Sequence, residues 1–367
     1  MSKIQETVLE IDLLALKHNF KYLQSKLHRT TKMLAVVKAF GYGSDAAIIA
    51  NYLEKLGLNY LAVAYTNEGV SLRKAGVSIP ILVLHPQPVN FETLIKYRLE
   101  PSLYNKRVLT TFLSSAKKQQ LYEYPIHIKF NTGLNRLGFL VNEVDFIANT
   151  LLKAPQVKVH SIFSHLAASE DSNEKEFTQQ QITSFKKIAK AFQQKIKYPI
   201  MLHQLNTSGV INYAEAQFDM VRCGIGLYGF ANDPLETNKL KIVASLKSVI
   251  SQIHYIEKGA SVGYNKAFTA TVPTITATIP IGHADGIHRA FGNGNGFVTV
   301  NDKKAPIVGN VCMDMLMVDI TGIECSEGDE VVIFSNQETV NELAENINSI
   351  SYEILTAISQ RIKRIVK

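Results

Sequence analysis

Residues 33–64, MLAVVKAFGYGSDAAIIANYLEKLGLNYLAVA, decide the fold. This stretch begins with a short continuous apolar run, Met33–Lys38, and ends with a second one, Tyr60–Ala64. Between them, Asp45–Leu58 has the apolar spacing of a helix. Apolar runs without alternation are typical of strands that are buried on both faces, as parallel sheets require. The stretch therefore predicts a strand–helix–strand unit with parallel strands.

The same alternation of apolar runs and helical segments continues to about residue 235. The further apolar runs are Pro80–His85, Pro101–Tyr104, Pro125–Asn131, Val157–His165, Met201–Asn206 and Phe218–Gly224. The helical segments between them include Asn67–Gly76, Phe91–Leu99, Glu143–Ala154 and Glu174–Gln194. Eight such units within roughly 200 residues favour a closed (β/α)8 TIM-type barrel over an open sheet. An extra helix from Asp12 to about Leu27, capped by Asp12, is expected before the first strand.

The pattern changes after about residue 235, where short strands joined by turn signals replace the helical segments. The expected strands are Val243–Ile256, Thr274–Ile281, Gly296–Val300, Ala305–Val311, Leu316–Ile320 and Glu330–Phe334, and the next expected helix is Asn341–Ile347. We therefore predict an α/β protein with two domains. The barrel covers residues 12–235, and a mainly β C-terminal domain covers residues 236–367 together with an N-terminal strand over residues 1–11.

The composition is that of a globular protein with a sizeable core. Of 367 residues, 46% are hydrophobic and 19% charged, which excludes a disordered chain, a collagen and a coiled coil. No apolar run reaches the roughly 20 residues of a membrane-spanning helix, and the first residues lack the pattern of a signal peptide. Cys223, Cys312 and Cys325 are too few and too scattered for a disulfide framework or a zinc site. We therefore expect a cytoplasmic protein without a metal or a membrane partner.

The net charge of +7 does not by itself indicate a nucleic-acid-binding protein. The lysines and arginines are spread along the chain, whereas a nucleic-acid-binding face concentrates them in a stripe or a basic helix. We expect most of this charge on the solvated surface. An anionic substrate or cofactor is the functional partner that it favours.

A barrel carries its working residues at the carboxyl ends of its strands and in the loops that follow. This rule selects Lys38, His85, Tyr104, Lys129, His165, Asn206 and Arg222. Lys38 closes the first expected strand, directly before the turn Gly41–Gly43. A lysine at that position either extends to solvent or takes part in the chemistry.

The loops after the last two barrel strands are the usual phosphate-binding loops of this fold. Here they read Asn206-Thr207-Ser208-Gly209 and Cys223-Gly224-Ile225-Gly226, with small residues and free backbone N–H groups. Each loop taken alone could be an ordinary turn. Combined with a lysine that can form a Schiff base, however, they predict a site for pyridoxal phosphate.

Six stretches in a fixed order point to a family. They are AVVKAFGYG (35–43), NTGLNRLG (131–138), MVRCGIGLYG (220–229), VGY (262–264), VCMD (311–314) and YEIL (352–355). With them, nearly the whole chain resembles the alanine racemases, pyridoxal-phosphate enzymes with a (β/α)8 barrel and a C-terminal β domain. The resemblance implies racemisation of alanine by two bases, D-alanine biosynthesis for peptidoglycan, and a homodimer with shared active sites.

The resemblance also assigns the catalytic roles. Lys38 would hold the cofactor as a Schiff base and act as one base, and Tyr264 would be the second base on the opposite face of the substrate. A racemase needs such a pair because a proton removed from one face must be replaced from the other. His165 would connect Tyr264 to Arg222, which would face the pyridine nitrogen of the cofactor.

The remaining site residues are binding residues. The cofactor, mainly at its phosphate, would be held by Tyr42, Asn206, Ser208, Gly224, Ile225 and Tyr352. Arg136 and the backbone N–H of Met313 would hold the substrate carboxylate. Lys129 matches a lysine that the family often carries as a carbamate, although it could equally be an ordinary ion-pairing lysine.

Two departures from the family pattern leave alternatives open. Asn131 replaces an aspartate near Lys129, and His283 stands where a tyrosine usually lines the entrance. The function could therefore be that of a broader-specificity or serine racemase of the same fold. A non-catalytic pyridoxal-phosphate-binding protein is a third alternative, but it would need neither Tyr264 nor the C-terminal domain.

Overall fold

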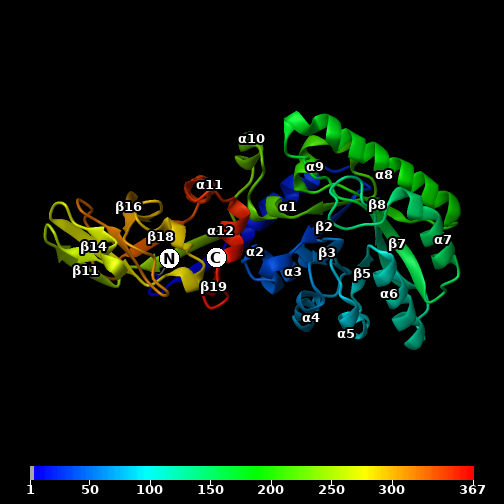
Figure 1. The fold of residues 1–367 in the computed structure, drawn as a ribbon, viewed down its shortest axis with the longest axis horizontal. Helices are drawn as coiled ribbons and strands as arrows, with labels where there is room; N and C mark the ends of the chain where they lie inside the picture. The colour runs from blue at the N-terminus through cyan, green and yellow to red at the C-terminus, as the bar shows by residue number, and fades with distance from the viewer. Residues whose placement is uncertain (1–3) are drawn as a thin grey trace.

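The computed structural model describes residues 4–367 and contains two lobes side by side, a helix-covered barrel and a β domain (Figure 1). Residues 1–3 of the expected N-terminal strand lie outside the described residues. Strand β1 covers Val8–Ile11. In this described part of the chain, no helix combines the length and apolarity needed to cross a membrane.

Eight parallel strands form the barrel within residues 32–223. They are β2 (Lys32–Val36), β3 (Tyr60–Val63), β4 (Ile81–Val83), β5 (Glu100–Leu103), β6 (Tyr124–Lys129), β7 (Val157–Phe163), β8 (Met201–His203) and β9 (Met220–Cys223). The barrel closes because β9 pairs with β2. Every residue of β3, β4, β5 and β9 is buried, which confirms the strands expected from continuous apolar runs.

Helices cover the outside of the barrel, as the alternation of the sequence predicts. They are α1 (Leu13–Ser25), α3 (Ala46–Lys55), α4 (Thr66–Lys74), α5 (Phe91–Lys96), α6 (Lys106–Lys118), α7 (Val144–Leu152), α8 (Lys175–Lys195) and α9 (Thr207–Asn212). The expected cap of α1 is confirmed, since the Asp12 carboxylate accepts a hydrogen bond from the Ala15 N–H at 2.8 Å.

The β domain is built on one nine-stranded sheet within residues 8–366. Its strand order is β11 (Gln252–Ile256), β14 (Thr274–Ile279), β17 (Leu316–Asp319), β16 (Lys303–Val308), β15 (Phe297–Val300), β18 (Glu330–Phe334), β10 (Ala244–Val249), β1 and β19 (Lys363–Val366). The single strand predicted over Val243–Ile256 is wrong. The chain breaks at Ile250–Ser251, so that β10 pairs with β1 and β18 while β11 pairs with β14.

Short elements complete this domain. They are β12 (Ser261–Val262), β13 (Phe268–Thr269), α10 (Pro234–Thr237), α11 (Gln337–Asn346) and α12 (Ser351–Ala357). Helix α11 begins four residues before the expected helix at 341, because Asn336 caps it by accepting the Thr339 N–H at 2.8 Å.

The C-terminal segment is fastened to the barrel beside α2 (Lys38–Tyr42), where Figure 1 shows α12 next to α2. The Arg364 guanidinium donates to the Gly43 carbonyl oxygen from Nε at 3.1 Å and from Nη2 at 2.9 Å. A Cβ on Gly43 would lie 2.2 Å from the Leu355 carbonyl oxygen, so only glycine allows this close approach. The β domain therefore fixes the backbone that follows Lys38.

Candidate active site

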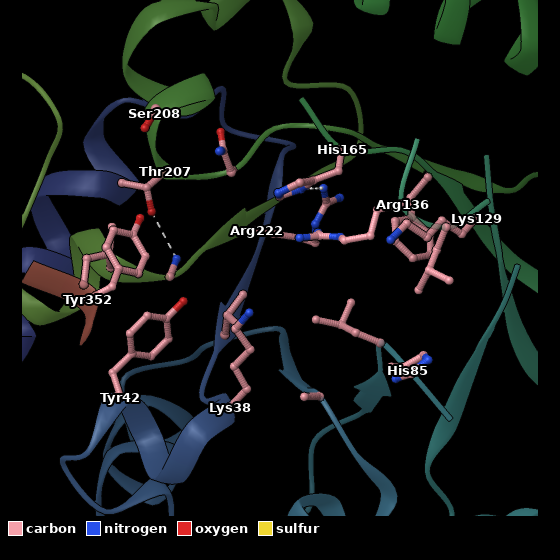
Figure 2. A pocket seen from close by; sticks show the side chains of 18 residues that line it. Lys38, Tyr42, His85, Lys129, Arg136, His165, Thr207, Ser208, Arg222 and Tyr352 are labelled. Atoms are coloured by element: carbon pink, nitrogen blue, oxygen red, sulfur yellow. Dashed lines mark hydrogen bonds between the residues drawn. The ribbon is translucent and has the colours of Figure 1, made fainter. Parts of the chain in front are cut away.

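A cavity of about 510 Å³ opens at the carboxyl ends of the barrel strands. It brings together eleven of the predicted site residues: Lys38, Tyr42, Lys129, Arg136, His165, Asn206, Ser208, Arg222, Gly224, Ile225 and Tyr352. Figure 2 shows Tyr42 and Tyr352 toward one end of the cavity, Lys129 and Arg136 toward the other, and Arg222 between them.

Not every residue selected from the sequence lies there. His85 lines the cavity, but Tyr104 does not, and its hydroxyl donates to the Pro86 carbonyl oxygen at 3.4 Å. Tyr264 and Met313 also lie outside the lining, in the β domain, and are 72% and 59% exposed. A single chain therefore does not bring Tyr264 to Lys38.

The backbone after Lys38 adopts an unusual conformation. Strand β2 ends at Val36 and Lys38 begins α2, so the prediction that Lys38 closes the strand is wrong by two residues. All residues of Ala39–Gly43 have positive φ, between 51° and 81°. This conformation costs roughly 1–2 kcal/mol for each non-glycine residue. The Glu68 carboxylate helps to hold it by accepting the Ala39 N–H at 2.7 Å, and the turn directs both Lys38 and Tyr42 to the cavity.

Both lysines of the cavity have a lowered pKa. Burial, reinforced by the nearby Arg136 charge, lowers the pKa of Lys38. Burial and the charges of Arg222 and Arg136 lower the pKa of Lys129 to about 8. A lysine with a depressed pKa is a nucleophile and a base near neutral pH, which suits Lys38 to Schiff-base chemistry.

Arg222 is the buried positive charge of the site. Its Nη2 donates to the carbonyl oxygens of Ser164 and Gln204, at 2.7 and 2.8 Å, and lies 3.1 Å from His165 Nδ1. Its Nη1 lies 2.7 Å from His203 Nδ1. Burial lowers the pKa of Arg222 to about 9, which still leaves the guanidinium charged at neutral pH. Burial and Arg222 together hold the pKa of His165 well below its ordinary value, so that its imidazole is neutral.

The loops after β8 and β9 form one continuous wall. The Asn206 side-chain oxygen accepts the Gly209 N–H at 2.9 Å and so caps α9. Thr207 Oγ1 accepts the Gly224 N–H at 3.1 Å, which joins the two loops (Figure 2). Thr207 also lines the cavity, and the sequence analysis missed it although it stands inside the quoted loop.

These residues fit pyridoxal phosphate. A Cβ on Gly224 would lie 2.6 Å from the Tyr42 hydroxyl oxygen, so a side chain there would fill the space between the loop and this tyrosine. Burial raises the pKa of Tyr42, and burial together with Glu170 raises that of Tyr352 to about 12, so both hydroxyls remain donors. Hydroxyl and backbone donors at one end match a phosphate, and Arg222 provides a donor for the pyridine nitrogen.

Fold and cavity together define a class, that of (β/α)8-barrel enzymes whose barrel mouth accepts pyridoxal phosphate and a small amino acid. Comparison with protein families gives two matches: the N-terminal domain of alanine racemase over residues 11–232 and its C-terminal domain over residues 243–366. The chain belongs to the alanine racemase family. Since the match includes the C-terminal domain, it argues against the barrel-only, non-catalytic alternative.

Individual relatives cover almost the entire chain. The alanine racemase of Halothermothrix orenii is 35% identical, over 98% of this chain and 96% of its own length. The alanine racemase structure from Clostridium difficile superposes with a TM-score of 0.93 at 31% identity, covering 99% of this chain and 96% of that chain. The Bartonella henselae alanine racemase, solved with covalently bound pyridoxal phosphate, gives a TM-score of 0.88 at 29% identity and covers 99% of each chain.

Proposed function

We propose that this chain interconverts L-alanine and D-alanine with pyridoxal phosphate bound covalently to Lys38. The observation that carries the proposal is the joint placement of Lys38, Arg222 and Arg136 in one cavity of an alanine racemase family member. When bound, the cofactor withdraws electrons from the substrate Cα–H bond and makes that proton removable.

Two bases on opposite faces would move the proton. Lys38, with its depressed pKa, accepts or donates the proton on one face. Tyr264 does so on the other face. A single base could return the proton only to the face from which it came, so the inversion of Cα requires both residues.

Arg222 would set the charge distribution of the site. Four acceptors fix its guanidinium, which remains charged and donates toward the pyridine nitrogen. A permanent donor at that position disfavours protonation of the nitrogen. Arg222 would thereby limit how strongly the cofactor withdraws electrons, which favours proton exchange over side reactions.

The binding residues form two groups, one at each end of the cavity. Tyr42, Ser208, Tyr352 and the loop residues Asn206, Gly224 and Ile225 hold the phosphate. Arg136 holds the substrate carboxylate through its two parallel donors, together with the Met313 N–H. Because about half of the Lys129 amine is neutral near pH 8, it can add carbon dioxide and, as a carbamate, pair with Arg136.

A homodimer would complete each site. Tyr264 and Met313 are both exposed on the β domain, together with Met315 at 48%. We propose that this surface covers the barrel mouth of a second copy, where it supplies Tyr264 and excludes water from Lys38.

The decisive experiment is a chiral assay of the purified protein with L-alanine and with D-alanine. Formation of the opposite enantiomer from each supports the proposal, and no conversion of either contradicts it. Serine and lysine in the same assay test the broader-specificity and serine racemase alternatives, which share Lys38, Tyr264 and Arg222. Faster turnover of serine than of alanine would favour them.

We further propose that the enzyme works in the cytoplasm and supplies D-alanine for peptidoglycan. Cys223, Cys312 and Cys325 are free thiols, as is usual in a reducing compartment. Fractionation of source cells with the chiral assay as readout tests the location. Rescue of a deletion strain by added D-alanine tests the role.

A further inference from the structure

A row of polar side chains fills the barrel interior beneath Arg222. It consists of His203 on β8, Ser161 on β7, His127 on β6 and Glu100 on β5, of which the first three are fully buried and Glu100 is 7% exposed. Barrel interiors are normally packed with branched apolar side chains. Polar groups in this position therefore need a reason beyond packing.

The row is one continuous chain of short hydrogen bonds. Arg222 Nη1 lies 2.7 Å from His203 Nδ1, and His203 Nε2 lies 2.8 Å from Ser161 Oγ. Ser161 Oγ lies 2.6 Å from His127 Nδ1, and His127 Nε2 lies 2.7 Å from Glu100 Oε2. The chain thus leads from the active-site guanidinium to a carboxylate at the opposite, N-terminal end of the barrel strands.

With each histidine carrying a single proton, the two ends allow only one direction of donation. A guanidinium can only donate, and a carboxylate can only accept. His203 must therefore accept at Nδ1 and carry its proton on Nε2, which it donates to Ser161. The Ser161 hydroxyl in turn donates to His127 Nδ1, and His127 donates from Nε2 to Glu100. Every donor in the chain points away from Arg222, and bonds aligned in this way strengthen one another in a low-dielectric interior.

Neighbouring side chains hold both ends of this hydrogen-bond chain in place. The Tyr60 hydroxyl also donates to Glu100 Oε2, at 2.6 Å, and Phe163 stacks on His203 with ring centroids 4.8 Å apart. The other titratable or charged groups near Glu100 are His160, Tyr124 and Arg73. Although burial raises the pKa of Glu100, the hydrogen bonds from His127 and Tyr60 outweigh it and leave the pKa below its ordinary value. Glu100 is therefore an anion.

We propose that Glu100 is a positioning residue of the reaction: the hydrogen-bond chain that it anchors holds Arg222 in the orientation in which it faces the cofactor ring. The proposal rests on the role proposed above for Arg222. Ser161 is the central link of this hydrogen-bond chain, because it joins the two histidines.

Nitrogen NMR of the native holoenzyme, labelled at histidine, tests the direction of the hydrogen-bond chain. A His203→Gln sample assigns the signal. The proposal expects His203 with a proton on Nε2 and none on Nδ1. A proton on Nδ1 would overturn it, since His203 could then not accept from Arg222.

Two variants test the consequence for Arg222. Ser161→Ala breaks the hydrogen-bond chain. Glu100→Gln keeps the shape of the side chain at position 100 but removes its negative charge. Each should lower kcat for alanine about tenfold, the order expected for a lost hydrogen bond to a charged group, with KM within about twofold. Each should also change the visible absorbance of the bound cofactor, because Arg222 faces its ring. An unchanged kcat with an unchanged spectrum overturns the proposal, as does a rise in KM alone.

Ser102→Ala is the matched control. Ser102 lies on β5, where it pairs with His127 of β6. Its hydroxyl is fully buried and has no hydrogen-bond partner among the described residues. The control should keep the native kcat and spectrum, and an effect equal to that of Ser161→Ala would overturn the proposal. If Ser161→Ala does not fold, Glu100→Gln decides alone, since it is isosteric.

Arg222→Gln separates the two proposals. If it leaves the spectrum unchanged, the role of Arg222 itself fails. If it alters the spectrum while Ser161→Ala and Glu100→Gln do not, only the positioning role of Glu100 fails.

Discussion

Lys38 and Tyr264 are separated within one chain: Lys38 lines the barrel-mouth cavity, whereas Tyr264 stands on the β domain with 72% of its surface exposed. Gly263, directly before Tyr264, has a φ of 76°, and the Asn310 side chain donates to the Tyr264 carbonyl oxygen at 3.3 Å. The Tyr264 backbone is thus held in a tight turn while its side chain is free to meet another molecule. A second copy of the chain is the occupant that the proposed two-base reaction requires.

Subunit mixing tests this arrangement. Lys38→Ala and Tyr264→Ala enzymes should each be inactive, but a hybrid dimer should have one site with both changes and one site with neither. With free exchange about half of the dimers are hybrids, so about a quarter of the sites should recover activity. Racemase activity is measured after mixing, with differently tagged chains to verify exchange. Complete exchange without recovery would place both bases on one chain.

Lys38→Ala tests the covalent link to the cofactor. The variant loses both the amine that forms the Schiff base and one of the two bases, so racemisation should fall by at least about a thousandfold. Borohydride, which fixes the cofactor to the native enzyme, should leave no cofactor on the denatured variant. Lys32→Ala, at the start of the same strand β2, is the control and should retain both properties. Cofactor still fixed to Lys38→Ala would assign the link to another lysine.

Much of the fold could be predicted because its signals are local. Barrel strands such as β3 and β4 are continuous apolar runs, and the cap at Asp12 lies within three residues of its partner. The strand break at Ile250–Ser251 could not be predicted, because the apolar pattern continues through it. Only the pairing of β11 with β14, far from β10 in the sheet, reveals it.

Some residues of the active site could likewise be predicted from the sequence, and others could not. Lys38, Asn206 and Arg222 follow from one rule, that barrels work at the carboxyl ends of their strands. The contact of His127 with Glu100 depends on how β5 and β6 are aligned, and the residues are 27 positions apart in the chain. No local sequence pattern predicts how two strands are aligned. The row of polar side chains in the barrel is therefore visible only in the structure.

Gly224→Ala should weaken cofactor binding. The added Cβ would lie 2.6 Å from the Tyr42 hydroxyl oxygen, too close for the two atoms to coexist without a shift. Tyr42 cannot easily move, because it stacks on Tyr228 with ring centroids 4.5 Å apart. We expect the Kd of the cofactor, measured by absorbance titration of the cofactor-free enzyme, to rise about tenfold or more.

Gly296→Ala provides the matched control for this prediction. Its Cβ would lie 2.7 Å from the Phe291 side chain, a similar crowding but in the β domain. It should therefore lower stability without changing the Kd. Equal affinity loss in both variants would show a general effect of destabilisation rather than contact at the cofactor site.

Lys129 should make stability depend on pH in a defined direction. In the unfolded chain this lysine binds a proton below about pH 10.5, but in the folded chain only below about pH 8. The unfolded state therefore binds more protons between these values, so stability falls as the pH is lowered from 10.5 to 8 and the loss is complete below 8. Lys129→Met removes this penalty. We expect the cofactor-free variant to gain about 3 kcal/mol at neutral pH and almost nothing above pH 10.5.

Denaturant unfolding of native and variant protein in carbon dioxide-free buffer, at both pH values, measures this difference. Lys17→Met, at an exposed lysine on α1, is the control and should show no gain that changes with pH. Bicarbonate should stabilise the native protein and not Lys129→Met, because only the native amine can become a carbamate that pairs with Arg136. A gain for Lys129→Met that is equal at both pH values would mean that packing, rather than the buried charge, sets the energy of this position.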